Sequence, residues 1–196
     1  MILMLAVASV LATVASARAQ DASAEVLFRD GDRLMAEGKL TAACTAFEAS
    51  NRVEARAGTL IRLGDCREKN GQLASAWSAY ADAESRAKDP TKQKVAAAKV
   101  RRLEPRLSRL TISVATPVAA LVIHRDRIAI DPALWSRALP IDGGAYVIRA
   151  TADGFAPWQA TVAVPDQDGV VTVVVPALRA LPRAATLPRS ARDRTD

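Results

Sequence analysis

Aromatic residues, histidine and cysteine are scarce in this chain of 196 residues. An aromatic content of 4% suits cores of Ala, Leu and Val more than a large cofactor pocket. The single histidine, His124, lies on an expected strand with Asp126 as its one nearby acid, so no nucleophile and base are paired. One histidine beside two cysteines also argues against zinc. We therefore expect no enzyme, no cofactor and no metal site.

Acidic residues are outnumbered, and the formal net charge is +6. The densest basic stretch comprises Lys99, Arg101, Arg102, Arg106 and Arg109. Nucleic-acid binding favours basic residues interleaved with aromatic ones, and this stretch contains no aromatic residue. We expect no nucleic-acid partner.

Charged residues are nearly absent from the first 19 positions, where Arg18 is the only one, and this run of apolar and small residues predicts a signal peptide. The apolar run ends in Ala17-Arg18-Ala19, which fits cleavage before Gln20. The positive residues expected before this run are missing, so a start codon further upstream stays an alternative. A buried helix or a membrane anchor is the alternative, although about 17 apolar residues is the low limit for a span. We expect a periplasmic or secreted protein with no integral membrane segment after cleavage.

An internal repeat is the most informative feature that is present. One set of four residues recurs 33 positions later with the same internal spacing: Gly31, Gly38, Ala43 and Phe47 become Gly64, Gly71, Ala76 and Tyr80. A period of this size indicates a helix-turn-helix unit that is copied and stacked, and such stacks usually hold another protein. The repeat therefore favours binding over catalysis.

Helical periodicity and breakers divide the region 20–107 into five helices. Gly38 and Gly71 end the first helix of each repeat, and Pro90 opens a fifth helix that caps the stack. The expected ranges are 24–37, 41–51, 59–70, 73–88 and 91–104. Pro105 closes this domain.

The two cysteines fall on helices that lie side by side in a stack of hairpins. Cys44 belongs to the second helix of the first repeat and Cys66 to the first helix of the second repeat. In an oxidising compartment we expect a disulfide, which would stabilise the fold by about 3 kcal/mol. The alternative is two buried thiols that fill the same interface.

The recurring glycine, small residue and aromatic residue resemble the tetratricopeptide repeat. Arg67 departs from the family pattern, which commonly has Tyr there. The resemblance implies a concave surface lined by the first helix of each pair, and it carries over six positions for partner binding: Phe28, Asp32, Met35, Ile61, Asp65 and Glu68. Asp32 and Asp65 are equivalent positions that would receive basic or amide groups of an extended peptide. The alternative is an acidic face that only contacts water.

The hydrophobic period changes from about 3.6 to 2 at Arg109, which predicts a second domain over 108–178. Strands are expected at 110–115, 121–125, 145–150, 158–164 and 170–175, forming a small antiparallel β-sandwich. The fold class is thus α+β in two separate domains. The tail 179–196, rich in Pro, Ala and Arg, is expected to be disordered.

The second domain resembles the PEGA domain, a small immunoglobulin-like sandwich of exported bacterial proteins. The resemblance rests on Leu139-Pro140, Gly143-Gly144, Tyr146, Asp153-Gly154-Phe155 and Trp158. Together the two halves resemble exported repeat-plus-sandwich proteins of myxobacteria and their relatives. This resemblance implies interaction rather than a reaction.

Two functions follow from these features. The leading hypothesis is a non-catalytic scaffold of the cell envelope that binds another protein or peptide in the groove of the helical repeats. The alternative is a sandwich that binds cell-wall or surface glycan, with Trp135 as the exposed ring, because alternation places Tyr146 and Trp158 in the core. The sequence does not identify the partner.

Overall fold

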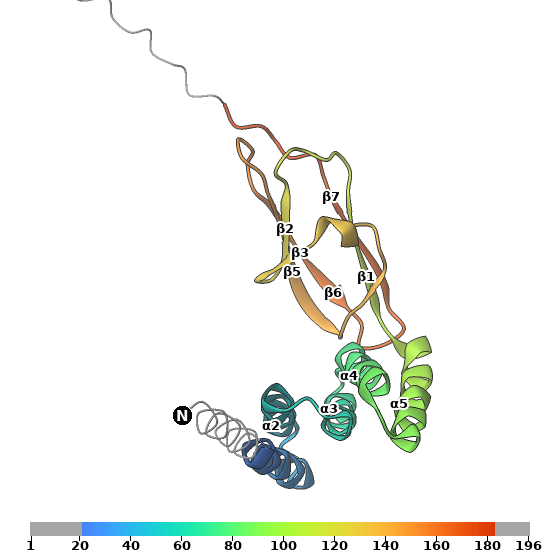
Figure 1. The fold of residues 1–196 in the computed structure, drawn as a ribbon. Helices are drawn as coiled ribbons and strands as arrows, with labels where there is room; N and C mark the ends of the chain where they lie inside the picture. Colours follow the sequence, from blue (N-terminus) through green and yellow to red (C-terminus); the bar gives the residue numbers. More distant parts are fainter. Residues whose placement is uncertain (1–20, 183–196) are drawn as a thin grey trace, which may run out of the picture. The chain divides into compact units, whose positions relative to one another are not determined.

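The computed structural model describes residues 21–182, and all five expected helices are present (Figure 1). The first is helical over residues 21–36 and is called helix 21–36 below. Four more follow: α2 (Leu40–Val53), α3 (Ala57–Lys69), α4 (Leu73–Arg86) and α5 (Pro90–Leu103), after which a 3₁₀ turn spans Glu104–Arg106. None of the helices in the described residues is both long and apolar enough to span a membrane.

The described chain divides into two compact units. The first contains residues 21–110 together with the segments 138–145 and 163–171, and the second contains 111–137, 146–162 and 172–182. Two segments of the strand-rich region therefore belong with the helices. Independent folding of 20–107 and 108–178 stays a prediction.

The repeated glycines and aromatic residues form the contact that closes each helical hairpin. A Cβ added at Gly31 would lie 2.7 Å from the ring of Phe47, and one at Gly64 would be closer still to the ring of Tyr80. Both rings are fully buried. The two helices of each hairpin approach closely because the glycine has no side chain, which explains the conserved spacing between the repeats.

Gly38 and Gly71 end the first helix of each hairpin, as predicted. Their φ angles of 75° and 80° lie in the left-handed region that favours glycine. In both turns the residue after the glycine donates its N–H to a carbonyl five positions earlier: Lys39 to Leu34 at 2.9 Å and Gln72 to Arg67 at 2.8 Å. These bonds satisfy carbonyls that the helix end would otherwise leave unpaired.

The predicted disulfide between Cys44 and Cys66 is confirmed, and it joins the two repeats. The two Cα atoms are 5.5 Å apart. Both residues are buried in one core cluster with Met35, Phe47 and Leu63. The disulfide thus ties α2 to α3 inside the core.

The fifth helix packs as a cap on the second hairpin. Asp89 accepts a hydrogen bond from the N–H of Thr91 at 2.8 Å, and Pro90 is the first helical residue. Leu103 is fully buried in a cluster with Leu73 and Tyr80. Polar residues cover much of the remaining surface of α5, which agrees with a capping role.

The strand-rich region forms two sheets, so the coarse fold class, α+β with helices before strands, is confirmed. One sheet has the order β4-β1-β7 and the other β3-β2-β5-β6. The strands are β1 (Arg109–Val114), β2 (Val122–Arg125), β3 (Ile128–Ile130), β4 (Leu139–Pro140), β5 (Gly144–Thr151), β6 (Trp158–Val164) and β7 (Val170–Val175). β3 and β4 were not expected from the sequence, because with three and two residues they are too short for a clear alternation.

The expectation of a wholly antiparallel region needs one correction. β2 does pair antiparallel with β3 and β5. The N–H of Arg109 donates to the carbonyl of Gly169 at 2.7 Å, and that of Ala115 to Val175 at 2.9 Å. Both strands advance six residues between these bonds, so β1 and β7 run parallel. Alternation along a strand does not report the direction of its neighbour.

The end of the described chain is still hydrogen-bonded to the second unit. The N–H of Ala156 donates to the carbonyl of Arg179 at 2.8 Å, and the N–H of Leu181 to that of Gly154 at 2.7 Å. Disorder was expected for the basic tail from residue 179, and this expectation is wrong for residues 179–181, which these bonds hold in place. The remainder of that tail and the predicted signal peptide 1–19 lie outside the described residues.

Candidate functional site

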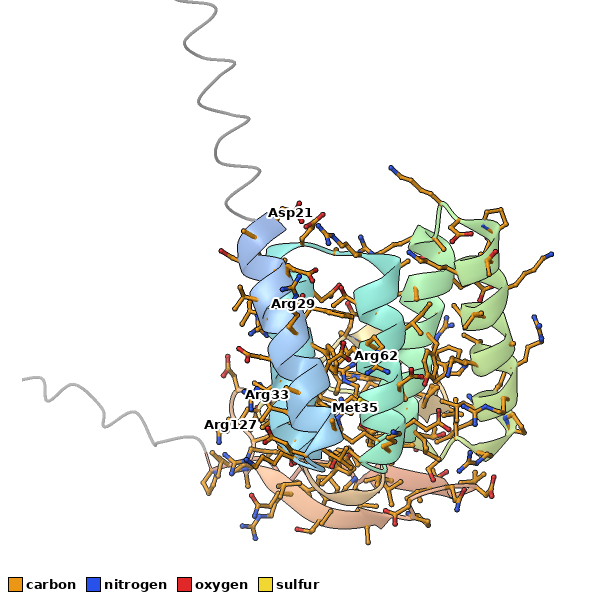
Figure 2. The ribbon with its side chains drawn as sticks, turned by 90° about the horizontal axis from the view of Figure 1, so that it is seen from below. Asp21, Arg29, Arg33, Met35, Arg62 and Arg127 are labelled. Carbon is orange, nitrogen blue, oxygen red and sulfur yellow. A yellow bond between two sulfur atoms is a disulfide. The ribbon has the colours of Figure 1, made fainter. Side chains whose placement is uncertain are left out.

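Two cavities lie along α3, and Arg62 lines both of them. Both are bounded by helix 21–36 on one side and by α5 on the other, with α3 between them. These are the first helix of each repeat and the capping helix. Figure 2 shows Met35 on helix 21–36 and Arg62 on α3. We call this surface the groove.

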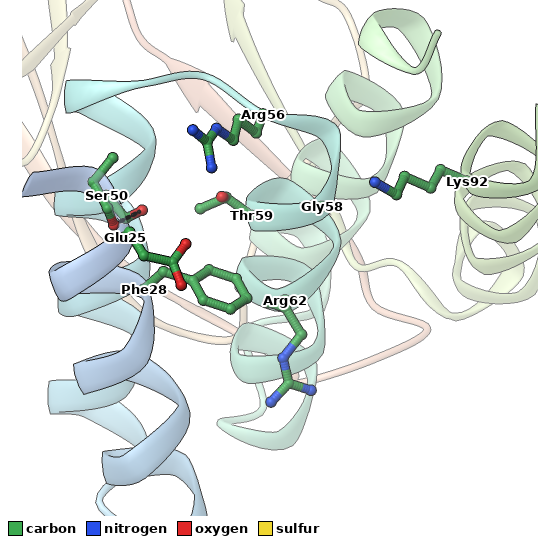
Figure 3. Close-up of a pocket in the computed structure, with 9 residues that line it drawn as sticks. Glu25, Phe28, Ser50, Arg56, Gly58, Thr59, Arg62 and Lys92 are labelled. Atoms are coloured by element: carbon green, nitrogen blue, oxygen red, sulfur yellow. Dashed lines mark hydrogen bonds between the residues drawn. The ribbon is translucent and has the colours of Figure 1, made fainter. Parts of the chain in front are cut away.

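The first cavity, called the Phe28 socket, has a volume of about 400 Å³ and lies at the start of α3 (Figure 3). Its lining comprises Ala24, Glu25, Phe28, Ser50, Arg56, Gly58, Thr59, Arg62 and Lys92. The Phe28 ring packs edge-on against Phe47, with centroids 5.6 Å apart. Because Phe47 is fully buried, this contact fixes one wall of the socket.

Three of the polar side chains that line the Phe28 socket, Ser50, Glu25 and Arg56, already have partners. The hydroxyl of Ser50 donates to the carbonyl of Ala24 at 2.8 Å, and both residues are buried. Glu25 accepts a hydrogen bond from Arg29 at 2.9 Å. Arg56 forms ion pairs with Asp21 and Glu54. An apolar group that enters the socket would therefore leave none of these hydrogen-bonding groups unsatisfied.

The second cavity, called the charged cavity, has a volume of about 460 Å³ and lies toward the end of α3. Its lining comprises Met35, Arg62, Asp65, Glu68, Lys69, Lys99, Arg102 and Arg106. Five of these side chains are cationic and two are carboxylates. The cavity thus carries a net positive charge, which the sequence analysis did not predict.

Asp32 and Asp65, expected to receive basic groups of a partner, are paired within the chain. Arg62 donates its Nε–H to Asp32 at 2.9 Å. Lys99 donates to Asp65 at 2.7 Å, and Arg62 also lies 3.8 Å from Asp65. The two carboxylates keep 40% and 22% of their side-chain surface exposed. They join helix 21–36, α3 and α5 by a line of alternating charges, so their negative charge is largely neutralised before a partner arrives.

The hydroxyl of Tyr80 also contacts the carboxylates of this line of charges. Its hydroxyl, on a fully buried side chain, donates toward Asp65 at 2.7 Å and Glu68 at 3.1 Å. Burial and these two carboxylates raise the pKa of the Tyr80 hydroxyl far above its ordinary value. The hydroxyl stays protonated and remains a hydrogen-bond donor to both carboxylates.

Glu68 is likewise engaged by basic residues that follow it in the chain. Arg102 donates to it at 2.6 Å, and Arg106 lies 3.9 Å away. Lys69 in the charged cavity and Lys92 in the Phe28 socket make no ion pair with any residue between 21 and 182. The groove therefore has paired carboxylates and unpaired ammonium groups.

The six positions carried over from the repeat family fall in three groups. Phe28 lines the socket, and Met35, Asp65 and Glu68 line the charged cavity. Asp32 contacts the groove through Arg62 but lines neither cavity. Ile61 packs against the buried cluster of Leu60, Ala83 and Ala96, away from both linings.

The basic side of the groove, which α5 supplies with Lys92, Lys99 and Arg102, was not expected from the sequence. The repeat period contains a signal that could have indicated this basic side. Extending the period of 33 once more places α5 at the position of a third first helix. The basic stretch that begins at Lys99 then falls opposite Asp65 and Glu68.

Trp135, the residue on which glycan binding was based, is only partly exposed. It follows a 3₁₀ turn over Pro132–Leu134, and its indole nitrogen is enclosed without a hydrogen-bond partner among the described residues. Tyr146 and Trp158 are also half-buried instead of lying in the core. Among residues 21–182, no group of three or more His, Cys, Asp or Glu side chains is placed to hold a metal ion.

No protein-family model matches the chain, and no curated protein shows significant sequence similarity to it.

Proposed function

We propose that this chain is an exported, non-catalytic interaction protein that holds a segment of another protein in the groove between helix 21–36, α3 and α5. The observation that carries the proposal is the pair of cavities that share Arg62 along α3. Together they offer an apolar compartment and a charged one to the same extended segment. The groove uses the first helix of each hairpin, as a tetratricopeptide repeat would.

Export to the periplasm or the cell exterior is part of the proposal. The Cys44–Cys66 disulfide is compatible with an oxidising compartment, where such bonds persist. The apolar segment before Gln20 has the pattern of a cleaved signal. The partner is then a protein of the cell envelope or a secreted protein.

The size of the groove sets the expected affinity. Two hairpins and a capping helix contact only a short peptide, so we expect dissociation constants in the micromolar range, near −8 kcal/mol. Paired charges such as Arg62 and Asp32 hold the groove in shape before binding and reduce the ordering cost.

The proposal is tested by selecting peptides from a random displayed library on the purified protein and mapping where they bind by hydrogen–deuterium exchange. We expect selected peptides to protect amides of helix 21–36, α3 and α5. Failure to select any peptide, or protection confined to the strands β1–β7, would refute the groove as the binding site.

Glycan binding through the strand-rich region is the competing function, and the same protein serves to test it. Retention on a cell-wall or polysaccharide matrix that Trp135→Ala abolishes would favour it. We expect no such retention, since Trp135 is partly covered and its indole nitrogen is enclosed.

A further inference from the structure

We infer that the occupant of the groove is an acidic segment that places one apolar side chain in the Phe28 socket. This inference rests on the proposed function and specifies the chemistry of the partner. It rests on the charges of the groove, on the pairing of its carboxylates and on the nature of the socket. Each of these is independent of the repeat resemblance.

Cationic side chains outnumber carboxylates among the residues that line the two cavities, and the surplus remains on Lys69 and Lys92 after Arg56 and Arg62 are paired with acidic residues outside the linings. The two linings together contain the cations Arg56, Arg62, Lys69, Lys92, Lys99, Arg102 and Arg106, against the carboxylates Glu25, Asp65 and Glu68. A partner with Asp and Glu residues meets a complementary potential here, and a basic partner meets a repulsive one.

The remaining carboxylates are not available to a basic partner without breaking internal pairs. Asp65 is held by Lys99 and by the Tyr80 hydroxyl, both at 2.7 Å. A basic ligand would have to displace Lys99, whose ammonium group also lies 5.0 Å from the centre of the Tyr80 ring. An acidic ligand needs no displacement, because Lys69 and Lys92 are unpaired among the described residues.

The Phe28 socket accepts an apolar side chain at the same end of the groove as Lys92. The Phe28 ring and the Cα of Gly58 contribute apolar surface to the lining, and the hydroxyl of Ser50 already donates to the carbonyl of Ala24. Figure 3 shows Lys92 extending from α5 toward this socket. A partner segment could bury an apolar side chain in the socket while the carboxylates beside that side chain pair with Lys92 at its edge.

Charge excludes the chain's own C-terminal segment as the best occupant. Residues 183–196 contain Arg183, Arg189, Arg192 and Arg194 against Asp193 and Asp196. The segment is therefore basic, like the groove. A second copy of the chain, with a formal charge of +6, is disfavoured for the same reason.

The first test is the composition of library peptides whose exchange footprint lies on helix 21–36, α3 and α5. We expect enrichment in Asp and Glu with one apolar residue, and lower affinity as salt increases. Groove-binding peptides that are neutral or basic would overturn this inference and leave the proposed function standing. Absence of any groove-binding peptide would overturn both.

The second test uses a matched pair of charge reversals on α5, measured by fluorescence anisotropy with a selected acidic peptide. Lys92→Glu, at the edge of the socket, should weaken binding by about five- to tenfold. Lys94→Glu makes the same change in net charge at an exposed position that lines neither cavity, and binding should change less than about twofold. Equal effects of the two would mean that only net charge matters and would overturn the assigned site.

The third test fills the socket without removing any core residue. A Cβ at Gly58 meets no atom within 4 Å, so Gly58→Leu fits a side chain into open space beside the socket. Peptide affinity should fall by about tenfold or more, which is the loss expected when the apolar side chain of the peptide can no longer be buried in the socket. Ala98→Leu, an exposed change on α5, is the control and should leave affinity unchanged. Unaltered binding to Gly58→Leu would refute the anchor.

Discussion

Replacing Gly64 by Ala should destabilise the protein, although the same change in most helices is stabilising. An added Cβ would overlap three atoms of the Tyr80 ring, the most distant of which is Cζ at 2.8 Å. The ring cannot move aside easily, because it is fully buried and its hydroxyl is bonded to Asp65 and Glu68. Overpacking of this kind costs about 1–3 kcal/mol, and a ring that cannot move places this site at the upper end, about 3 kcal/mol, while helix propensity returns about 1 kcal/mol. We expect a net loss of roughly 2 kcal/mol, measured by urea unfolding.

Gly58 lies in the same helix, and its replacement by Ala is the control, because the expected change in stability has the opposite sign. A Cβ there meets open space, so Gly58→Ala should stabilise by roughly 0.5–1 kcal/mol. A Gly64→Ala variant as stable as the parent chain would refute the close packing of α3 on α4. A loss of stability in both variants would mean that helix distortion, not contact with Tyr80, is the cause.

Three further predictions concern the same compact unit. Asp142 accepts hydrogen bonds from the backbone N–H of Ser75 at 3.0 Å and from its hydroxyl at 2.6 Å, and so caps the first turn of α4; Asp142→Ala should cost about 1–2 kcal/mol in urea unfolding, and unchanged stability would contradict this role. Because the pKa of Tyr80 is raised in the folded state, its contribution to stability is complete below about pH 10, the ordinary tyrosine value, and is lost as the pH rises above it. An ultraviolet titration should show the Tyr80 phenol ionising only with unfolding, and ionisation of Tyr80 in folded protein near pH 10 would contradict its burial. Thiol counting on unfolded, unreduced protein should find no free thiol at Cys44 or Cys66, and reduction should lower the free energy of unfolding by about 3 kcal/mol; two free thiols would contradict the bridge.

Local sequence signals predicted most of the elements because their causes are local. The glycine at each helix end, the proline at the start of α5 and the alternation in β6 each act within a few residues. The disulfide also followed, because stacking adjacent hairpins brings α2 beside α3. The parallel pairing of β1 with β7 did not follow, since it joins strands 60 positions apart.

The charge of the groove was not predictable from single positions for the same reason. Asp32 meets Arg62 at a separation of 30 residues, and Asp65 meets Lys99 at 34. Only the packing of helix 21–36, α3 and α5 decides that these opposite charges pair with one another. Asp32 and Asp65 look available in the sequence but are paired in the fold, and the cationic lining residues without an ion pair to residues 21–182 are Lys69 and Lys92.

The most direct test of the groove is the side-chain Nε–H resonance of Arg62 in nitrogen-15-labelled protein during titration with a library-selected peptide. Arg62 lines both cavities and donates this N–H to Asp32 at 2.9 Å, so a segment lying along α3 must change its surroundings. The account predicts a saturable shift of this resonance in the micromolar range. Saturation of peptide binding with the Arg62 resonance unmoved would contradict it.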